Sequence, residues 1–338
     1  MALVETGESW GSITPRRPND NAKSAPIMGG RHSAGTISGK GGVSVSQSSA
    51  SARGGFLLGV LAYAWWGLIP LYFRQIRDVN AVEILAQRVV WSVVLLALMV
   101  AVLGGGRDIV RVLRDRKLVL TLTLSAALIA VNWLLYIHAT VTDRVTEAGL
   151  GYYVMPLVNA FLATIFLGEK LRPAHYPALA LVAVGVAVPL VVLGSGWLAV
   201  VLPVSFGFYS LVRKKVAVES FTGLAVETLL LLPFCLAYLG YCETTGHLSF
   251  GADPTVTALL AGGGIITVVP LLAFTMSLRR LPLLAVTCIQ VISPTMQFAV
   301  AIFWNGEQPP WPMWVALGCV WVAVAIFIAD AARHARRP

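Results

Sequence analysis

The sequence predicts an all-α integral membrane protein with ten transmembrane helices, built as two inverted five-helix repeats. Three observations support this prediction: an apolar composition, ten apolar segments of membrane-spanning length, and a repeat inside those segments. Of the 338 residues, 57% are hydrophobic and only 12% are charged, and the mean hydropathy is +0.77. Soluble domains carry roughly a quarter charged residues. The composition is therefore typical of a membrane protein.

The N-terminal segment, residues 1–54, differs from the rest of the chain. It is rich in Ser, Gly, Thr and Pro and has almost no apolar run. Such a composition cannot bury enough apolar surface to fold, so we expect a disordered cytoplasmic tail. Met28 is an alternative start. No apolar h-region precedes Phe56, so we expect no cleaved signal peptide.

Ten apolar segments follow the tail. A span needs about 20 apolar residues, and only the sixth segment is short. Five spans in each copy divide the chain into a first repeat, residues 55–194, and a second repeat, residues 195–332. An odd number of spans forces the second copy to enter the membrane in the opposite orientation. The expected spans are 56–74, 81–103, 118–138, 145–168, 174–193, 197–212, 222–241, 256–277, 282–304 and 310–330.

The repeat is clearest in the fourth and ninth spans, where residues 150–171 match residues 288–309 at a constant offset. Each segment has a proline near the middle of a membrane-length helix. Duplicated, interrupted membrane helices are typical of secondary transporters. The aligned pairs are Pro156 with Pro294, Asn159 with Gln297, Phe166 with Trp304, and Gly168-Glu169 with Gly306-Glu307.

Lysine and arginine are distributed unevenly between the connecting segments. If the N-terminus is cytoplasmic, most basic residues fall in cytoplasmic segments, and only Arg74, Arg77 and Arg144 fall outside. Cytoplasmic loops of membrane proteins carry an excess of Lys and Arg. We therefore expect both termini to lie in the cytoplasm, which also agrees with an even number of spans.

The paired prolines predict helix breaks at Pro156 and Pro294. Proline has no N–H, so the carbonyl four residues earlier loses its helical partner. Positions −4, 0 and +3 share a helix face. One face therefore reads Tyr152–Pro156–Asn159 and the other Gln290–Pro294–Gln297. We expect the two faces to meet at mid-membrane and bind substrate; the alternative is that the prolines kink the helices and the amides bond neighbouring backbone.

Three acidic residues are candidates for gating or proton coupling. Glu83 in the second span aligns with Glu227 in the seventh, and inversion places them at opposite membrane faces. The alternative is that each caps the first turn of its own helix, where the helix dipole favours an anion. Glu147 lies at the start of the fourth span, where capping is the stronger explanation.

Arg88 is the only basic residue that we place inside a span. A charge inside the membrane needs a partner or a water-filled cavity. A carboxylate from another helix, Glu147 first, would make a structural ion pair, or the side chain would snorkel to the membrane surface; alternatively, Arg88 binds an anionic substrate. In the third span, Asn132, Trp133 and Tyr136 recur at about one helical turn, and their rings could stack on a planar or amphipathic substrate.

Several motifs together resemble those of the RarD-like permeases, a branch of the EamA family in the drug/metabolite transporter superfamily. The resemblance covers about residues 53–330. It implies two inverted EamA-type five-helix bundles in the bacterial inner membrane. The motifs, in chain order, are GVLAYAWWGLIPLYFRQI, EILAQRVVWS, NWLLYIHA, EAGLGYYVMPLVN, FLGEKL, ETLLLLP, RRLPL and ISPTMQF.

We expect a secondary-active exporter of small metabolites or amphipathic compounds that works by alternating access. An intramembrane enzyme acting on lipid-linked substrates, or a membrane sensor or scaffold, are the alternatives. No nucleotide-binding motif, metal-spaced cluster or Ser/His/Asp arrangement is evident, so we expect no enzyme activity, no cofactor, no metal site and no nucleic-acid partner. The expected partners are the lipid bilayer and an unknown small molecule; a homodimer is left open.

Overall fold

The computed structural model describes residues 42–142, 144–194, 197–304 and 308–335. The chain divides into residues 1–43 and a compact unit, Ser44–Pro338. Apart from its residues 42–54, the expected N-terminal tail lies outside the described residues. Residues 42–54 are helical, because the first helix already begins at Gly42.

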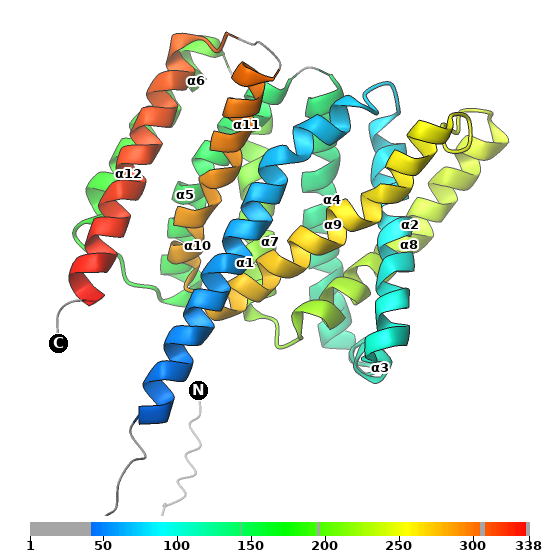
Figure 1. The fold of residues 1–338 in the computed structure, drawn as a ribbon, viewed down its shortest axis with the longest axis horizontal. Coiled ribbons are helices and arrows are strands. Elements are labelled where there is room, and N and C mark those ends of the chain that lie inside the picture. The colour runs from blue at the N-terminus through cyan, green and yellow to red at the C-terminus, as the bar shows by residue number, and fades with distance from the viewer. Residues whose placement is uncertain (1–41, 143, 195–196, 305–307, 336–338) are drawn as a thin grey trace, which may run out of the picture. The chain divides into compact units, whose positions relative to one another are not determined.

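The secondary structure of the described residues is entirely helical (Figure 1). The first half contains α1 (Gly42–Arg74), α2 (Ala81–Leu103), α3 (Gly106–Arg114), α4 (Arg116–Val141), α5 (Val145–Leu167) and α6 (His175–Leu193). The second half contains α7 (Leu198–Lys215), α8 (Ser220–Thr244), α9 (Pro254–Arg280), α10 (Leu283–Gln290), α11 (Ile292–Phe303) and α12 (Trp311–Ala335).

Nine segments within the described ranges are long and apolar enough to cross a bilayer, and α10 together with α11 up to Val300 counts as one of them. The chain is therefore an all-α, multi-pass membrane protein. The helix α7 occupies the position of the expected sixth span but is not among the nine. Its last turn holds Arg213, Lys214 and Lys215, which shortens its apolar part.

The ninth span is interrupted and the fourth is not, which corrects one of the two expected helix breaks. α10 ends at Gln290 and α11 begins at Ile292, just before Pro294. In contrast, α5 runs continuously through Pro156. A proline removes only one backbone hydrogen bond, and the bonds on either side can keep the helix continuous. The expected break at Pro156 is therefore wrong.

Close helix pairs hold the unit together. α6 lies alongside α12, and α2 packs against both α8 and α9 (Figure 1). Glycines allow the closest approaches, as they commonly do between membrane helices. A Cβ atom on Gly264 of α9 would lie 2.6 Å from the backbone carbonyl oxygen of Trp91 in α2. A Cβ on Gly185 of α6 would lie 2.5 Å from the Cβ of Cys319 in α12.

Basic side chains at the ends of α7 and α9 donate hydrogen bonds to backbone carbonyls. The Nζ atom of Lys214 donates to the carbonyl oxygens of Leu278, at 3.2 Å, and Leu281, at 2.6 Å. Arg279 donates to the carbonyl oxygen of Val218. The last carbonyls of a helix have no partner within the helix, so cations commonly satisfy them. These contacts tie the α7–α8 connection to the C-terminal end of α9.

A carboxylate caps the start of the broken span. Glu169, just after α5, accepts hydrogen bonds from the backbone nitrogens of Leu283 and Leu284, at 2.8 and 3.2 Å. These are the first residues of α10, whose N–H groups have no intrahelical partner. Glu169 therefore anchors α10 to the end of α5. Its aligned counterpart, Glu307, lies outside the described residues.

Candidate functional site

A cavity lies among the helices of both halves of the chain. The space open to the centre of a water molecule is about 40 Å³. Since one buried water needs about 10–15 Å³ by this measure, the cavity has room for roughly three waters. It is lined by Tyr63, Trp66, Ile69, Phe73, Arg88, Asn132, Trp133, Tyr136, Tyr152, Phe206, Gln290, Ser293 and Gln297.

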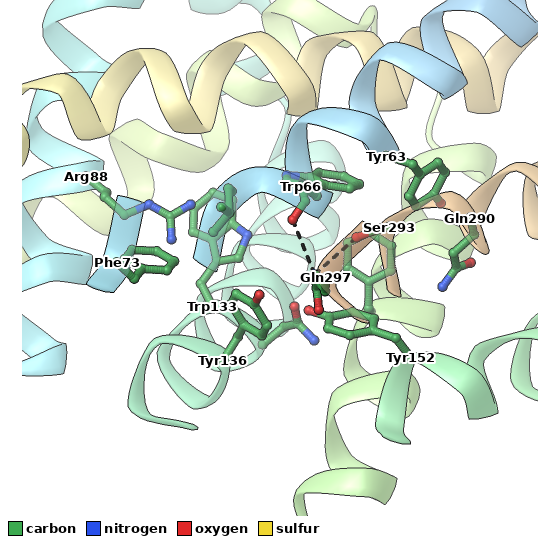
Figure 2. A pocket seen from close by; sticks show the side chains of 13 residues that line it. Tyr63, Trp66, Phe73, Arg88, Trp133, Tyr136, Tyr152, Gln290, Ser293 and Gln297 are labelled. Atoms are coloured by element: carbon green, nitrogen blue, oxygen red, sulfur yellow. Dashed lines mark hydrogen bonds between the residues drawn. The ribbon is translucent and has the colours of Figure 1, made fainter. Parts of the chain in front are cut away.

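The two ends of the cavity differ in chemistry. Figure 2 shows Arg88 and Phe73 at one end, Tyr63 and Gln290 at the other, and Gln297 between them. Seven of the eight side chains expected to bind substrate line this cavity, and the eighth, Asn159, contacts one of them. The structure therefore brings together polar residues that are far apart in the sequence.

The amide end is built by direct contact between α5 and α10. Asn159 is 1% exposed, and its Nδ2 atom donates to Oε1 of Gln290 at 3.1 Å. The remaining amide atoms, Oδ1 of Asn159 and Nε2 of Gln290, have no hydrogen-bond partner within the described part of the chain, and neither has the hydroxyl of Tyr63. A buried polar atom left unpaired costs about 1–3 kcal/mol. This end is thus suited to a ligand that forms hydrogen bonds.

Gln297 satisfies a backbone group that a proline leaves free. Pro70 lies inside α1, so the carbonyl of Trp66, four residues earlier, cannot accept the usual helical bond. The Nε2 atom of Gln297 donates to that carbonyl oxygen at 3.2 Å, and also to Oγ of Ser293 at 3.2 Å (Figure 2). Gln297 therefore joins α11 to the kinked part of α1.

The cationic end is Arg88, which is 3% exposed. Its Nε atom donates to Oγ1 of Thr267 in α9 at 2.9 Å. The guanidinium carbon lies 4.7 Å from the centre of the Trp133 ring and 5.5 Å from that of Phe73. Cations favour the faces of aromatic rings, most of all that of tryptophan. No carboxylate within the described residues forms an ion pair with Arg88.

The expected pairing of Arg88 with Glu147 involves a side chain that lies outside the described residues. Glu147 lies in the first turn of α5. The contacts that the structure assigns to Arg88 are the hydroxyl of Thr267 and the two rings. Gly263, one turn before Thr267, leaves room for the stem of Arg88, because a Cβ there would lie 2.8 Å from its Cγ.

Asn132 is held by hydrogen bonds to α7, and aromatic rings form the walls. The Nδ2 atom of Asn132 donates to the carbonyl oxygen of Leu202 at 2.9 Å and to Oγ of Ser205 at 3.1 Å, both in α7. The ring centres of Tyr136 and Tyr152 are 5.7 Å apart in an edge-on arrangement. Such pairs pack rigidly. The amide of Asn132 therefore has an architectural role, while the neighbouring rings shape the cavity.

The two aligned carboxylates lie away from the cavity lining. Oε1 of Glu83 accepts hydrogen bonds from the backbone nitrogens of Ser249 and Phe250, at 2.9 and 3.0 Å, in the α8–α9 connection. Glu227 is not in the first turn of α8, which begins at Ser220. The capping alternative is therefore wrong for Glu227, whereas Glu83 does lie in the first turn of α2, where that alternative places it.

Glu227 instead belongs to a buried cluster from three helices. Its Oε1 atom accepts a hydrogen bond from Oγ of Ser125 in α4 at 2.5 Å and lies 3.7 Å from Nη1 of Arg213 in α7. Arg213 is 3% exposed. Arg213 directly follows the expected sixth span, 197–212, so the sequence predicts that it lies in a connecting segment. It is the second buried arginine among the described residues.

Several lining residues are not among the candidate site residues listed from the sequence, and helical spacing could have indicated those in α1. Tyr63, Trp66, Ile69 and Phe73 in α1 are spaced three or four residues apart and so lie on one helix face. Phe206 and Ser293 carry no comparable signal, because single aromatic or hydroxyl residues are common in membrane helices. Their position depends on which face of α7 or α11 turns inward.

Comparisons with known proteins agree with this architecture. The model of the EamA-like transporter family matches residues 53–191. Protein RarD of Salmonella typhimurium is 43% identical over 282 residues, covering 82% of this chain and 96% of that protein. An uncharacterized transporter of Vibrio cholerae is 39% identical over 290 residues, covering 85% of this chain and 96% of that protein.

A solved crystal structure is similar in fold, with a TM-score of 0.63 and 17% identity, and the match covers 87% of this chain and 99% of that one. At that identity the likeness concerns the fold alone. The relatives are much closer, and they match this chain over nearly their whole length. Together with the apolar helices, they show that the chain is a membrane transporter and belongs to the RarD-like permeases of the EamA family.

Proposed function

We propose that this protein is a secondary-active exporter of small metabolites or amphipathic compounds, and that it works by alternating access. The observation that carries the proposal is the small cavity lined by α1, α2, α4 and α5 from the first half and by α7, α10 and α11 from the second. Four of its lining residues, Tyr63, Tyr136, Gln290 and Gln297, have a buried polar atom without a partner in the described part of the chain. In this proposal the cavity is the substrate site in a closed state.

The proposed architecture is ten spans in two inverted repeats, residues 55–194 and 195–332, with α7 as the sixth span. Two contacts support it. The hydrogen bond from Asn159 to Gln290 joins the two segments that repeat in the sequence. The helices α6 and α12, which are the last spans of the two repeats, pack against each other.

The proposed location is the bacterial inner membrane, with both termini in the cytoplasm. The support is the excess of Lys and Arg in the segments that this orientation places inside, such as α3, whose residues Arg107, Arg111 and Arg114 are exposed. In this orientation Glu83 lies near the outer surface and Glu227 near the inner surface.

Glu83 and Glu227 are the proposed gating residues, and Glu147 is a third candidate for gating or proton coupling. Glu83 joins α2 to the α8–α9 connection, and Glu227 joins α8 to α4 and α7. A carboxylate that loses such contacts on protonation would release one helix from another. Alternating access requires contacts of this kind at both ends of the cavity.

The experiment compares metabolites in the medium and in cells that express the wild-type protein, an inactive variant or an empty vector. We expect a compound to appear faster in the medium only when the protein is active. Gln290→Leu is the inactive variant, and Phe166→Leu, at an exposed position of α5, is the active control. Faster loss of a compound from the medium would show uptake in place of export. Identical profiles in all strains would overturn transport.

A further inference from the structure

Arg88 leaves most of its hydrogen-bonding capacity unused. Its Nε atom donates to Thr267, but neither terminal nitrogen has an acceptor within the described part of the chain. An arginine guanidinium has five N–H donors arranged as a planar fork. The unused edge is therefore the pair of terminal nitrogens, and Arg88 lines the cavity.

The surrounding groups hold the guanidinium in one orientation. Thr267 donates its own hydroxyl hydrogen to the carbonyl of Gly263 at 2.7 Å, so its oxygen is left to accept from Arg88. The rings of Trp133 and Phe73 lie 4.7 and 5.5 Å from the guanidinium carbon. The hydrogen bond fixes one edge of the guanidinium, and the rings restrict its faces. The remaining edge is therefore pre-organised, which lowers the entropy lost when a ligand binds.

A fixed, buried cation with no counter-ion among the described side chains favours an anion from outside the protein. Charges inside the membrane are costly and mark substrate pathways when they line a cavity. The planar fork of arginine matches a carboxylate in a two-point contact. The cavity has room for only roughly three waters, so solvation of the cation inside it is limited.

The rest of the cavity lining indicates the chemistry of the other parts of the ligand. Trp66, Tyr136 and Phe206 offer flat, apolar walls. The opposite end offers amide atoms of Asn159 and Gln290 without partners in the described protein. A ligand that satisfies all three regions has an anionic group, a planar apolar body and, at its far end, a neutral hydrogen-bonding group.

We propose that the substrates are small organic carboxylates with a planar apolar body, and that Arg88 binds their carboxylate. This inference rests on the proposed function of the cavity as the transport site. The carboxylate lies against the terminal nitrogens of Arg88, and the body lies along the aromatic walls towards Gln290. The cavity widens to admit such a molecule. An inorganic anion would satisfy Arg88 but would leave the walls and the amides unused.

The test measures binding by the purified full-length protein in lipid nanodiscs, using matched pairs of ligands. The pairs are 3-phenylpropanoate with 3-phenylpropanamide and indole-3-propanoate with indole-3-propanamide; acetate and inorganic phosphate are the small-anion probes. Binding is read from the thermal shift and from tryptophan fluorescence. We expect each carboxylate to bind about ten- to a hundredfold tighter than its amide, because its hydrogen bonds to Arg88 join two charged groups. Acetate and phosphate should bind more weakly than the larger carboxylates.

Three variants separate the role of Arg88 from general effects of charge. Arg88→Gln should remove the preference for the carboxylate, so that both members of a pair bind equally. Thr267→Val keeps the cation but releases its Nε atom, and it should reduce the preference. If Arg88→Gln does not fold, Thr267→Val still tests the inference. Arg77→Gln removes an exposed arginine and should leave the preference unchanged.

Equal binding of carboxylate and amide by the wild-type protein, or binding of neither, would overturn the inference. So would an unchanged preference in Arg88→Gln, or tighter binding of phosphate than of the aromatic carboxylates. These outcomes are distinct from failure of the proposed function. Protein-dependent release of only neutral or cationic compounds would contradict the proposal that the substrates are carboxylates, while it would still support transport. Selective binding of carboxylates without any protein-dependent release would support the anion site and contradict transport.

Discussion

The side chain of Asn159 donates a hydrogen bond of 3.1 Å to the side chain of Gln290. Asn159 lies in α5 and Gln290 ends α10, so the bond joins the two segments that repeat in the sequence. Both residues are at most 2% exposed, and each has one further amide atom without a partner in the described structure. The contact is therefore a polar junction between the halves at one end of the cavity.

Replacing either side of this junction should stop or redirect transport. Asn159→Leu or Gln290→Leu removes the hydrogen bond and leaves the other amide unpaired, at a cost of about 1–3 kcal/mol. Leucine suits the bilayer, so membrane insertion should remain normal. The measurement is release of the identified substrate, normalised to the amount of inserted protein. Phe166→Leu, in the same helix but 44% exposed, should transport normally. Wild-type rates in both junction variants would place the substrate site elsewhere.

The second prediction concerns Pro70 and Gln297. Gln297→Leu removes the donor that satisfies the carbonyl of Trp66 and should destabilise the protein by about 1–3 kcal/mol. Pro70→Ala restores a backbone N–H, so the same carbonyl can be satisfied within α1. In the Pro70→Ala background, Gln297→Leu should therefore cost less. A double-mutant cycle from thermal unfolding in detergent measures the difference. Equal costs in both backgrounds would show that the two residues act independently.

The third prediction concerns the close approach of α2 and α9. Gly264→Ala places a Cβ atom 2.6 Å from the carbonyl oxygen of Trp91, so the helices must move apart. Overpacking of this kind costs about 1–3 kcal/mol. Gly262→Ala, in the same helix, is the matched control, because its Cβ would meet nothing within 4 Å. The unfolding temperature should fall for Gly264→Ala and stay the same or rise for Gly262→Ala.

The fourth prediction concerns the buried pair of Arg213 and Glu227. Glu227→Leu leaves Arg213 without its carboxylate, and breaking a buried pair in this way costs about 3–5 kcal/mol. Arg213→Leu combined with Glu227→Leu removes both charges and should recover much of the loss. Folded protein after membrane extraction, measured by size-exclusion chromatography, reports the effect. A double variant less stable than the single one would indicate that Arg213 has another essential partner.

The fifth prediction tests the proposed orientation by cysteine labelling in a background without native cysteines. Asp78→Cys and His247→Cys lie at exposed positions on the side proposed to be outside. Arg107→Cys and Lys170→Cys lie at exposed positions on the side proposed to be inside. Impermeant thiol reagents should label only the first pair in intact cells, and all four after permeabilisation. Labelling of the second pair in intact cells would contradict cytoplasmic termini.

Much of the helical layout could be predicted from the sequence, because apolar runs and basic loops act locally. The polar faces of α5 and of α10 with α11 were also readable, since their residues recur at helical spacing. The uninterrupted course of α5 through Pro156 could not be predicted from the sequence. One lost hydrogen bond can leave a helix continuous or broken, and the neighbouring helices decide which.

The partners of buried charges could not be predicted from the sequence. Arg88 contacts Thr267 and Trp133, which are neutral and distant in the chain, so no charge pattern points to them. Arg213 lies in a basic run that is typical of a loop, yet it is buried against Glu227. Both outcomes depend on how α2, α7 and α9 are packed, which is a property of the folded unit.

The contacts of Lys214 and Arg279 with backbone carbonyls affect how the orientation of this protein can be engineered. Positive charges direct a nascent segment to stay in the cytoplasm during insertion. After folding, these two residues hold the α7–α8 connection against α9. A neutral substitution at Lys214 would therefore disturb biogenesis and the finished protein together. Exposed arginines such as Arg107 and Arg116 allow the topological signal to be varied by itself.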